Sequence, residues 1–331
     1  MNGLLALLRR FRVDPYLVLI LGMVVLATLL PVRGAAADAF GLATRLAIAL
    51  LFFFHGAKLS REAVLAGLTH WRLHLSVLAA TFALFPLIGW AARFLPAWIL
   101  PGPLAAGVLF LCCLPSTVQS SIAFVGIARG NVAAAVVAAS ASNLLGIFIT
   151  PVLITLLMHT GGAGGFSMSQ VEGIVLQLLA PFIAGQIVRQ WIGAWVERHR
   201  QRLGQYDRGT ILMVVYGAFS AAVVEGIWRQ VSPLQIALLG AVSCALLALM
   251  LGATAFGARA LGFSKQDEIT IVMCGSKKSL ASGAPMAGIL FPAASVGLIL
   301  LPLMIFHQIQ LMACAALAQR YAERPETLSE A

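Results

Sequence analysis

The chain consists mainly of long apolar stretches separated by short polar segments. Each stretch has about 20 residues, the length that a helix needs to cross a bilayer. The apolar positions are continuous rather than alternating, so the stretches do not have the pattern of barrel strands. They predict ten membrane-spanning helices, at residues 15–31, 40–57, 74–95, 104–128, 131–158, 171–190, 209–228, 233–257, 266–290 and 293–318. The only longer polar loop that this pattern predicts covers residues 191–208.

Composition supports the same class of protein. Of the 331 residues, 60% are hydrophobic and only 10% are charged, whereas about a quarter are charged in a soluble domain. The net charge of +10 does not indicate a nucleic-acid partner, because the basic residues collect in the segments predicted to face one side of a membrane. We therefore expect an all-α polytopic membrane protein whose main partner is the lipid bilayer.

The basic residues also predict the orientation of the chain, because Lys and Arg accumulate in cytoplasmic loops. An N-terminus in the cytoplasm leaves only Arg33, Arg93 and Arg229 on the opposite side. It puts these on the cytoplasmic side: Arg9, Arg10, Arg12, Lys58, Arg61, Arg72, Arg129, Arg189, Arg198, Arg200, Arg202, Arg208, Arg259, Lys265, Arg320 and Arg324. We expect a multi-pass protein of the cell (inner or plasma) membrane with both termini in the cytoplasm, as a monomer or weak homodimer.

The chain divides into two halves, residues 1–160 and 161–331, with five predicted spans each. The fourth and ninth spans share a polar centre, and the serines that mark these centres, Ser116 and Ser276, are 160 positions apart (276 − 116 = 160). Because each half has an odd number of spans, the halves would have opposite orientations. Inverted repeats with a pair of interrupted helices are typical of secondary transporters that bind substrate near the midplane.

The fourth span contains a helix-breaking sequence. Pro115 has no backbone N–H and disfavours helix at Leu114. Ser116 and Gln119 fit a capping box, which predicts that a second half-helix begins there. The alternative is a proline kink in which the serines bond back to the preceding turn. In the first case, the polar residues that follow the break would line a cavity: Thr117, Ser120 and Ser121.

The ninth span contains two lysines, Lys277 and Lys278, between Ser276 and Ser279. Each buried lysine costs several kcal/mol, so such residues normally face a polar cavity. A cap at Ser276 would place both at the positive end of a second half-helix. The alternative is a break near one surface, with the lysines extending to water. We expect carbonyls at the end of the facing half-helix to bind one lysine, and a substrate or proton role for the other.

Further polar residues lie in the fifth and tenth spans. Asn143 either reaches the crossing of the two broken spans or forms an interhelical hydrogen bond. In the tenth span, packing at a helix interface is the main interpretation for His307, Gln308 and Gln310, and titration of His307 is the alternative. The five cysteines all lie in apolar stretches and none has zinc-type spacing. We expect no metal site and no cofactor.

Four segments resemble the bile acid:sodium symporter family, and its member-seven-like branch in particular. They are Phe-Phe-Phe-His-Gly-Ala-Lys-Leu-Ser (52–60), Leu-Pro-Ser-Thr-Val-Gln-Ser-Ser (114–121), Ala-Arg-Gly-Asn-Val-Ala (128–133) and Gly-Ser-Lys-Lys-Ser-Leu-Ala-Ser-Gly (275–283). The resemblance implies two inverted five-helix repeats, a panel domain of spans one, two, six and seven, and a core domain of spans three to five and eight to ten. It also implies that broken helices four and nine cross, that substrate binds beside the crossing, and that the core moves against the panel.

The departures from the family pattern concern sodium. The sodium-coupled branch has a glutamate just before the glycine of the ninth-span motif, where this chain has Met273 and Cys274. It has a glutamine where Lys277 aligns and an asparagine where Lys278 aligns. In the fourth span its Ser-Asn pair appears here as Ser120-Ser121. A missing carboxylate and two added ammonium groups predict that sodium coupling is lost and that a lysine acts as a tethered cation.

The leading functional hypothesis is a secondary transporter of a small organic anion, working as a uniporter or with protons. The alternative is a non-transporting regulator of ion (calcium) homeostasis, with which the resembled branch is associated. An enzyme is not expected, since adjacent positions on a helix diverge and Ser276 and Lys277 would not form a catalytic pair. The predicted substrate and crossover residues are Ser116, Thr117, Gln119, Ser120, Ser121, Asn143, Ser276, Lys277, Lys278 and Ser279.

Overall fold

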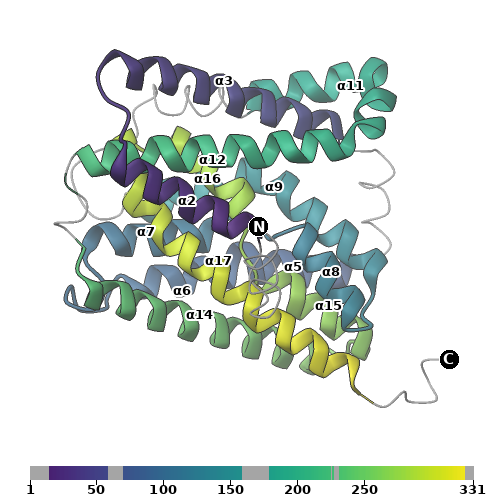
Figure 1. The fold of residues 1–331 in the computed structure, drawn as a ribbon. Helices are drawn as coiled ribbons and strands as arrows, with labels where there is room; N and C mark the ends of the chain where they lie inside the picture. Colours follow the sequence, from purple (N-terminus) through teal and green to yellow (C-terminus); the bar gives the residue numbers. More distant parts are fainter. Residues whose placement is uncertain (1–14, 59–69, 159–178, 225, 227–230, 325–331) are drawn as a thin grey trace, which may run out of the picture.

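The structure is a computed structural model that describes residues 15–58, 70–158, 179–224, 226 and 231–324 (Figure 1). Residues 171–178 of the predicted sixth span, the predicted boundary between the halves, Arg61 and Arg229 lie outside these ranges. Every regular element in the described ranges is a helix. The elements are α2 (Pro15–Leu29), α3 (Ala35–Lys58), α5 (Trp71–Ala79), the π-helix η1 (Ala80–Leu84), α6 (Phe85–Ala92), α7 (Gly102–Cys113), α8 (Gln119–Ile127), α9 (Val132–Met158), α11 (Ala180–Arg198), α12 (Arg200–Val224), α14 (Pro233–Ala260), α15 (Lys265–Gly275), α16 (Leu280–Leu290) and α17 (Ala293–Ala322).

Several of these helices are long and apolar enough to cross a membrane. Among the described residues there are six: α3, the continuous stretch Trp71–Ala92, α9, α12, α14 and α17. Their outer faces carry large apolar side chains, such as Phe256, Leu46 and Leu87 at 76%, 64% and 61% exposure. Apolar surface on this scale fits a lipid environment rather than water. The structure therefore describes a multi-pass membrane protein, while the count of ten spans stays a prediction.

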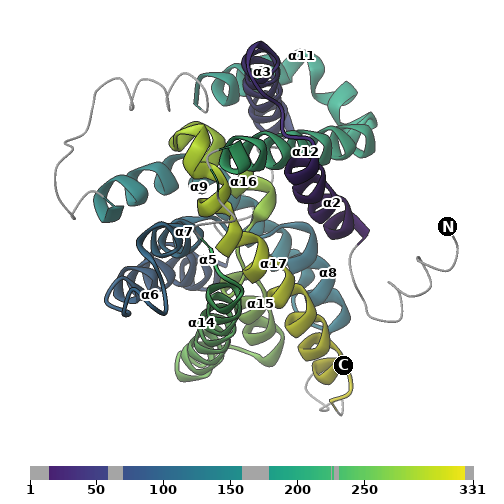
Figure 2. The ribbon, with the colours of Figure 1, turned by 60° about the vertical axis from the view of Figure 1, so that its left-hand side comes forward.

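The helices are arranged in two layers. In both views α3 and α11 lie at the top, with α12 beneath them and α2 beside α12; we call these four helices the upper layer and the remaining helices the lower layer (Figures 1 and 2). Within the upper layer α3 packs against α11 and α12, and α2 packs against α12. Helix α12 also contacts α16 and α17 of the lower layer. The upper layer contains the helices expected to form the panel, whereas its movement as a separate body stays a prediction.

The predicted loop at residues 191–208 is wrong, because these residues are helical. Helix α11 continues to Arg198 and α12 begins at Arg200, with only His199 between them. Arg, Gln and Glu have high helix propensity, and polar residues do not by themselves end a helix. Some of the polar groups also have tertiary partners: Lys58 Nζ donates to Asp207 Oδ2 at 2.8 Å. This stretch therefore belongs to the packed upper layer.

Two glycines allow the closest helix contact in the upper layer. A Cβ added at Gly56 of α3 would lie 2.1 Å from the carbonyl oxygen of Phe182. A Cβ added at Gly185 of α11 would lie 1.9 Å from the carbonyl oxygen of Phe53. Small residues let membrane helices approach until their backbones touch. The pairing of α3 with α11 therefore requires glycine at both positions.

Candidate functional site

The fourth predicted span is interrupted, as expected from its proline. Helix α7 ends at Cys113, Leu114 is extended, and α8 begins at Gln119. The predicted capping box is wrong, because Val118 occupies the N-cap position and no side chain caps α8. Ser116 Oγ donates instead to the carbonyl oxygen of Cys274. That carbonyl lies in the last turn of α15, where backbone oxygens lack intrahelical donors, and so it competes successfully for the hydroxyl.

The ninth predicted span is also interrupted. Helix α15 ends at Gly275 with Ser276 as its C-cap, and α16 begins at Leu280 with Ser279 as its N-cap. Ser279 Oγ accepts from the N–H of Ser282 at 3.1 Å, so Ser279 and not Ser276 caps the second half-helix. Ser276 Oγ donates to the carbonyl oxygen of Val272 at 2.6 Å. The lysines thus follow the C-terminal end of α15, where cations are favoured.

The two interruptions meet and bind each other. The N–H of Ser279 donates to the carbonyl oxygen of Pro115 at 2.9 Å. Ser121 Oγ donates to the carbonyl oxygen of Met273 at 3.1 Å. Together with the bond from Ser116 to Cys274, these contacts join the segment between α7 and α8 to the segment between α15 and α16. We call this region the crossover, defined as residues 114–118 and 276–279 with the helix ends beside them.

Lys278 binds three backbone carbonyls at the crossover. Its Nζ donates to Cys112 and Leu114 at 2.7 Å each and to Thr81 at 2.8 Å, and the residue is fully buried. The ring centroid of Phe85 lies 4.2 Å from Nζ. An ammonium has three donors, so all of them are satisfied. The expectation that one lysine binds carbonyls at the end of the facing half-helix is confirmed for Lys278.

The carbonyl of Thr81 is available because the backbone there forms a π-helix. In an α-helix it would accept from the N–H of Phe85, but that N–H bonds to Ala80 in η1. The next residue, Pro86, has no N–H to offer. Local π-helices commonly occur at functional positions. Here the π-turn and the proline leave one buried oxygen free, and Lys278 binds it.

Lys277 has a different environment from its neighbour. The residue is fully buried, and its Nζ has no hydrogen bond with any group in the described part of the chain. The ring centroid of Phe124 lies 4.4 Å from Nζ. A cation–π contact compensates for only part of the cost of burying an ammonium. Lys277 is therefore the cation of the crossover that still has hydrogen-bonding capacity.

Each interruption is supported by the helix that follows the broken span, α9 for the first and α17 for the second. On α9, Ser142 Oγ accepts from the N–H of Ser116 at 3.0 Å. Asn143 Nδ2 donates to the carbonyl oxygen of Ser116 at 2.7 Å, and its Oδ1 accepts from Ser282 Oγ at 2.6 Å. On α17, Gln310 binds both the N–H and the carbonyl oxygen of Lys278, each at 2.8 Å. Backbone groups of Ser116 and Lys278, one in each interruption, are thus bound within the protein, as a membrane interior requires.

Sequence reasoning placed Asn143 at the crossover but missed the role of Gln310. Asn143 connects Ser116 with Ser282, so its contacts combine the two interpretations that the sequence left open. Gln310 was interpreted as a packing residue of the tenth span. A usable signal was present, since a glutamine in the span after a broken helix can satisfy both backbone groups of one residue.

The remaining predicted residues lie around the start of α8. Thr117 Oγ1 is 2.9 Å from Ser121 Oγ and accepts from Ser120 Oγ at 2.8 Å. Gln119 is exposed and lines a cavity of about 540 Å³ between α8 and α12. All ten predicted residues therefore lie at the crossover or in the first turn of α8, or support it from α9. Their role in substrate binding stays a prediction.

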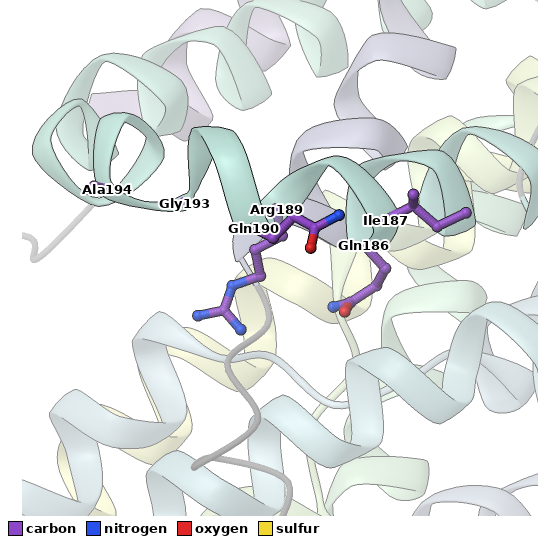
Figure 3. A pocket seen from close by; sticks show the side chains of 6 residues that line it. All are labelled: Gln186, Ile187, Arg189, Gln190, Gly193 and Ala194. Carbon is purple, nitrogen blue, oxygen red and sulfur yellow. The ribbon is translucent and has the colours of Figure 1, made fainter.

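A larger hollow of about 740 Å³ lies along α11. Figure 3 shows the side chains of Gln186, Arg189 and Gln190 projecting from this one helix. The described lining residues all belong to α11: Gln186, Ile187, Arg189, Gln190, Gly193 and Ala194. None of them comes from the crossover, so this hollow does not combine the elements that the candidate site requires.

Comparison with known proteins adds independent findings. The sequence profile of the SBF-like CPA transporter family matches residues 14–323. An uncharacterized protein of Pseudomonas aeruginosa is 55% identical over 322 residues, 97% of each chain. The putative symporter YfeH of Escherichia coli K12 is 54% identical over 326 residues, again 97% of each chain. Sodium/bile acid cotransporter 7 of Rattus norvegicus is 30% identical over 275 residues, 81% of this chain and 79% of that one.

Proposed function

The chain belongs to the SBF-like CPA transporter family, and from this premise we propose that it is a secondary transporter of a small organic anion. Membership confirms the resemblance to bile acid:sodium symporters and makes the chain a transporter-family protein rather than an enzyme. In the proposed mechanism the lower layer moves against the upper layer and exposes the crossover to each side of the membrane in turn. The proposed transport proceeds without sodium.

The proposal that transport is not coupled to sodium rests on the environment of Lys278. Hard cations are bound in proteins by sets of oxygen atoms, and the crossover offers such a set in the carbonyls of Thr81, Cys112 and Leu114. The Nζ of Lys278 already binds all three at 2.7–2.8 Å. The donor set therefore fits an ammonium better than sodium.

Lys277 supports the choice of an anionic substrate. Its ammonium is buried at the crossover without a hydrogen bond to any described group, and an anion would supply the missing acceptor. The neighbouring hydroxyls of Ser116 and Ser276 are engaged by backbone carbonyls. In the proposed site Lys277 therefore provides the charge, while Thr117, Gln119 and Ser120 provide polar groups at the start of α8, the helix whose Phe124 contacts Lys277. If Lys277 releases a proton during the transport cycle, transport of the anion would be coupled to proton movement at the same site.

Sodium independence can be tested on the purified protein by thermal unfolding in detergent. Sodium chloride is titrated against choline chloride at constant ionic strength. We expect identical melting temperatures, since a ligand stabilises the folded state only where it binds. Saturable stabilisation specific to sodium would contradict the proposal.

Transport can be tested in proteoliposomes with anions that stabilise the purified protein. We expect uptake of at least one such anion in sodium-free buffer, and loss of uptake in Lys277→Met. The melting temperature of the variant serves as the folding control. If a folded Lys277→Met variant still takes up the anion without sodium, the proposed role of this lysine is contradicted.

A further inference from the structure

The cavity between α12 and the start of α8 has features of a binding site beyond those of the crossover. We infer that this cavity is an anion-recognition vestibule, and that its ligand is a small hydrophilic carboxylate rather than an amphipathic steroid. The inference rests on the proposed function and gives a chemical class to its substrate. The cavity has a volume of about 540 Å³ and is lined by Gln119, Arg200, Gln201, Gly204, Gln205 and Arg208.

The wall on α12 is a regular pattern on one helical face. Arg200, Gly204 and Arg208 recur at intervals of four residues, which places them in one row. The two arginine backbones are therefore about 12 Å apart along the axis, within the combined reach of two arginine side chains toward one ligand. A Cβ added at Gly204 would meet nothing within 4 Å. Gly204 thus leaves open space on this helical face, between the backbone positions of the two arginines.

The facing wall comes from the crossover. Gln119 is the first residue of α8 and its side chain is exposed. Helix α8 lies below the first half of α12 in both views (Figures 1 and 2). Because Gln119 follows the interrupted segment 114–118 directly, a ligand held by α12 can contact the start of α8. The vestibule therefore bridges the upper and lower layers at the point where the proposed movement would change their spacing.

The charge of the cavity favours an anion. Its described lining contains two arginines and no carboxylate. Arg208 lies 5.4 Å from the ring centroid of Tyr16 and pairs with no described acid. Arg200 pairs with Glu197 at 3.2 Å, but these side chains are 76% and 68% exposed, and exposed pairs contribute little. Both guanidinium groups can therefore offer the two parallel N–H donors that bind a carboxylate.

The uncharged lining residues indicate that the ligand is hydrophilic. Besides the arginines, the described lining consists of glutamines and a glycine, with no aliphatic or aromatic side chain. Sites for large apolar ligands are lined mainly by hydrophobic and aromatic side chains. Three glutamine amides instead offer donors and acceptors to hydroxyl or carbonyl groups. The hydroxyl and carboxyl groups of a hydroxylated or dicarboxylic acid would find matching partners in these side chains.

The test is a binding comparison on the full-length protein in detergent without sodium. Succinate and gluconate represent hydrophilic carboxylates and cholate represents an amphipathic one, with isothermal calorimetry as the readout. We expect saturable binding of at least one hydrophilic carboxylate, weakened about tenfold or more in Arg208→Gln and in Gly204→Leu. Gly204→Leu fills the cavity without removing a charge. Arg202→Gln, a change on the same helix outside the cavity, serves as the matched control and should bind as the native protein does.

The outcomes separate this inference from the proposed function. Binding of cholate alone, binding of none of the three, or equal binding by native protein and a folded Arg208→Gln would overturn the vestibule. Binding that depends on Arg208, without uptake into proteoliposomes, would support the vestibule and contradict transport. Uptake that is unchanged in both Arg208→Gln and Gly204→Leu would support transport and overturn the vestibule.

Discussion

Two adjacent lysines differ in their surroundings at the centre of this protein. Lys278 has every ammonium donor bound to a carbonyl, whereas Lys277 has an aromatic ring and no hydrogen bond to a described group. The sequence predicted that one lysine would bind carbonyls, because two cations in mid-span need partners. It could not say which one, since the choice depends on the π-turn that frees Thr81 and on the exact ends of α7 and α15.

Substitution of the lysines should therefore have unequal effects on stability. Lys278→Met leaves three buried carbonyls without a donor, at a cost of about 1–3 kcal/mol for each unsatisfied group. Lys277→Met removes an ammonium that satisfies no carbonyl. We expect a clear fall in the melting temperature for Lys278→Met and no fall for Lys277→Met, measured by thermal unfolding in detergent. Equal falls, or the reverse order, would contradict this assignment.

At the scale of helices, each interruption is stabilised by a neighbouring helix as well as by its own local sequence. Pro115 predicted the first interruption correctly, because a missing N–H acts within the segment itself. The predicted cap at Ser116 was wrong, and Ser276 does not cap either, because both serines bind carbonyls instead of the N–H groups of the following helix. Ser116 reaches a partner 158 positions away in the chain. Such long-range competition cannot be predicted from capping motifs.

Glycines within a single helix provide a test of helix packing. Gly56→Ala would place a methyl group 2.1 Å from the carbonyl oxygen of Phe182, whereas a Cβ at Gly41 on the same helix would meet nothing within 4 Å. We expect Gly56→Ala to lower the melting temperature strongly, because both partners of the clash are backbone. Gly41→Ala should be neutral or stabilising, since alanine favours helix by up to about 1 kcal/mol. If both variants melt alike, α3 and α11 are not packed as described.

For the whole molecule, hydrophobic pattern alone predicted the helical class and most element positions. Predicted spans at 40–57, 131–158, 233–257 and 293–318 correspond to α3, α9, α14 and α17. The pattern could not locate the crossover contacts, because hydropathy describes which residues meet lipid and not which helices meet each other. The loop at 191–208 was wrong because its Arg, Gln and Glu residues favour helix even where they are exposed, and because Asp207 binds Lys58 of α3.

The orientation in the membrane follows from the distribution of basic residues and can be checked directly. We expect a C-terminal green fluorescent protein fusion to be fluorescent and a C-terminal alkaline phosphatase fusion to be inactive, because both termini are predicted to be cytoplasmic. Fusions after Arg33 should give the opposite pattern. Phosphatase activity at the C-terminus would overturn the predicted orientation.

The tethered ammonium of Lys278 has an energetic consequence for the proposed cycle. A cation that enters with its substrate contributes the free energy of its own concentration gradient. A cation attached to the chain has a high effective concentration at its site, but it returns with the protein in every cycle and has no gradient. It can hold the crossover together in any salt, yet it supplies no driving force. Accumulation of the anion beyond equilibrium would then have to draw on protons, on the membrane potential or on a second solute.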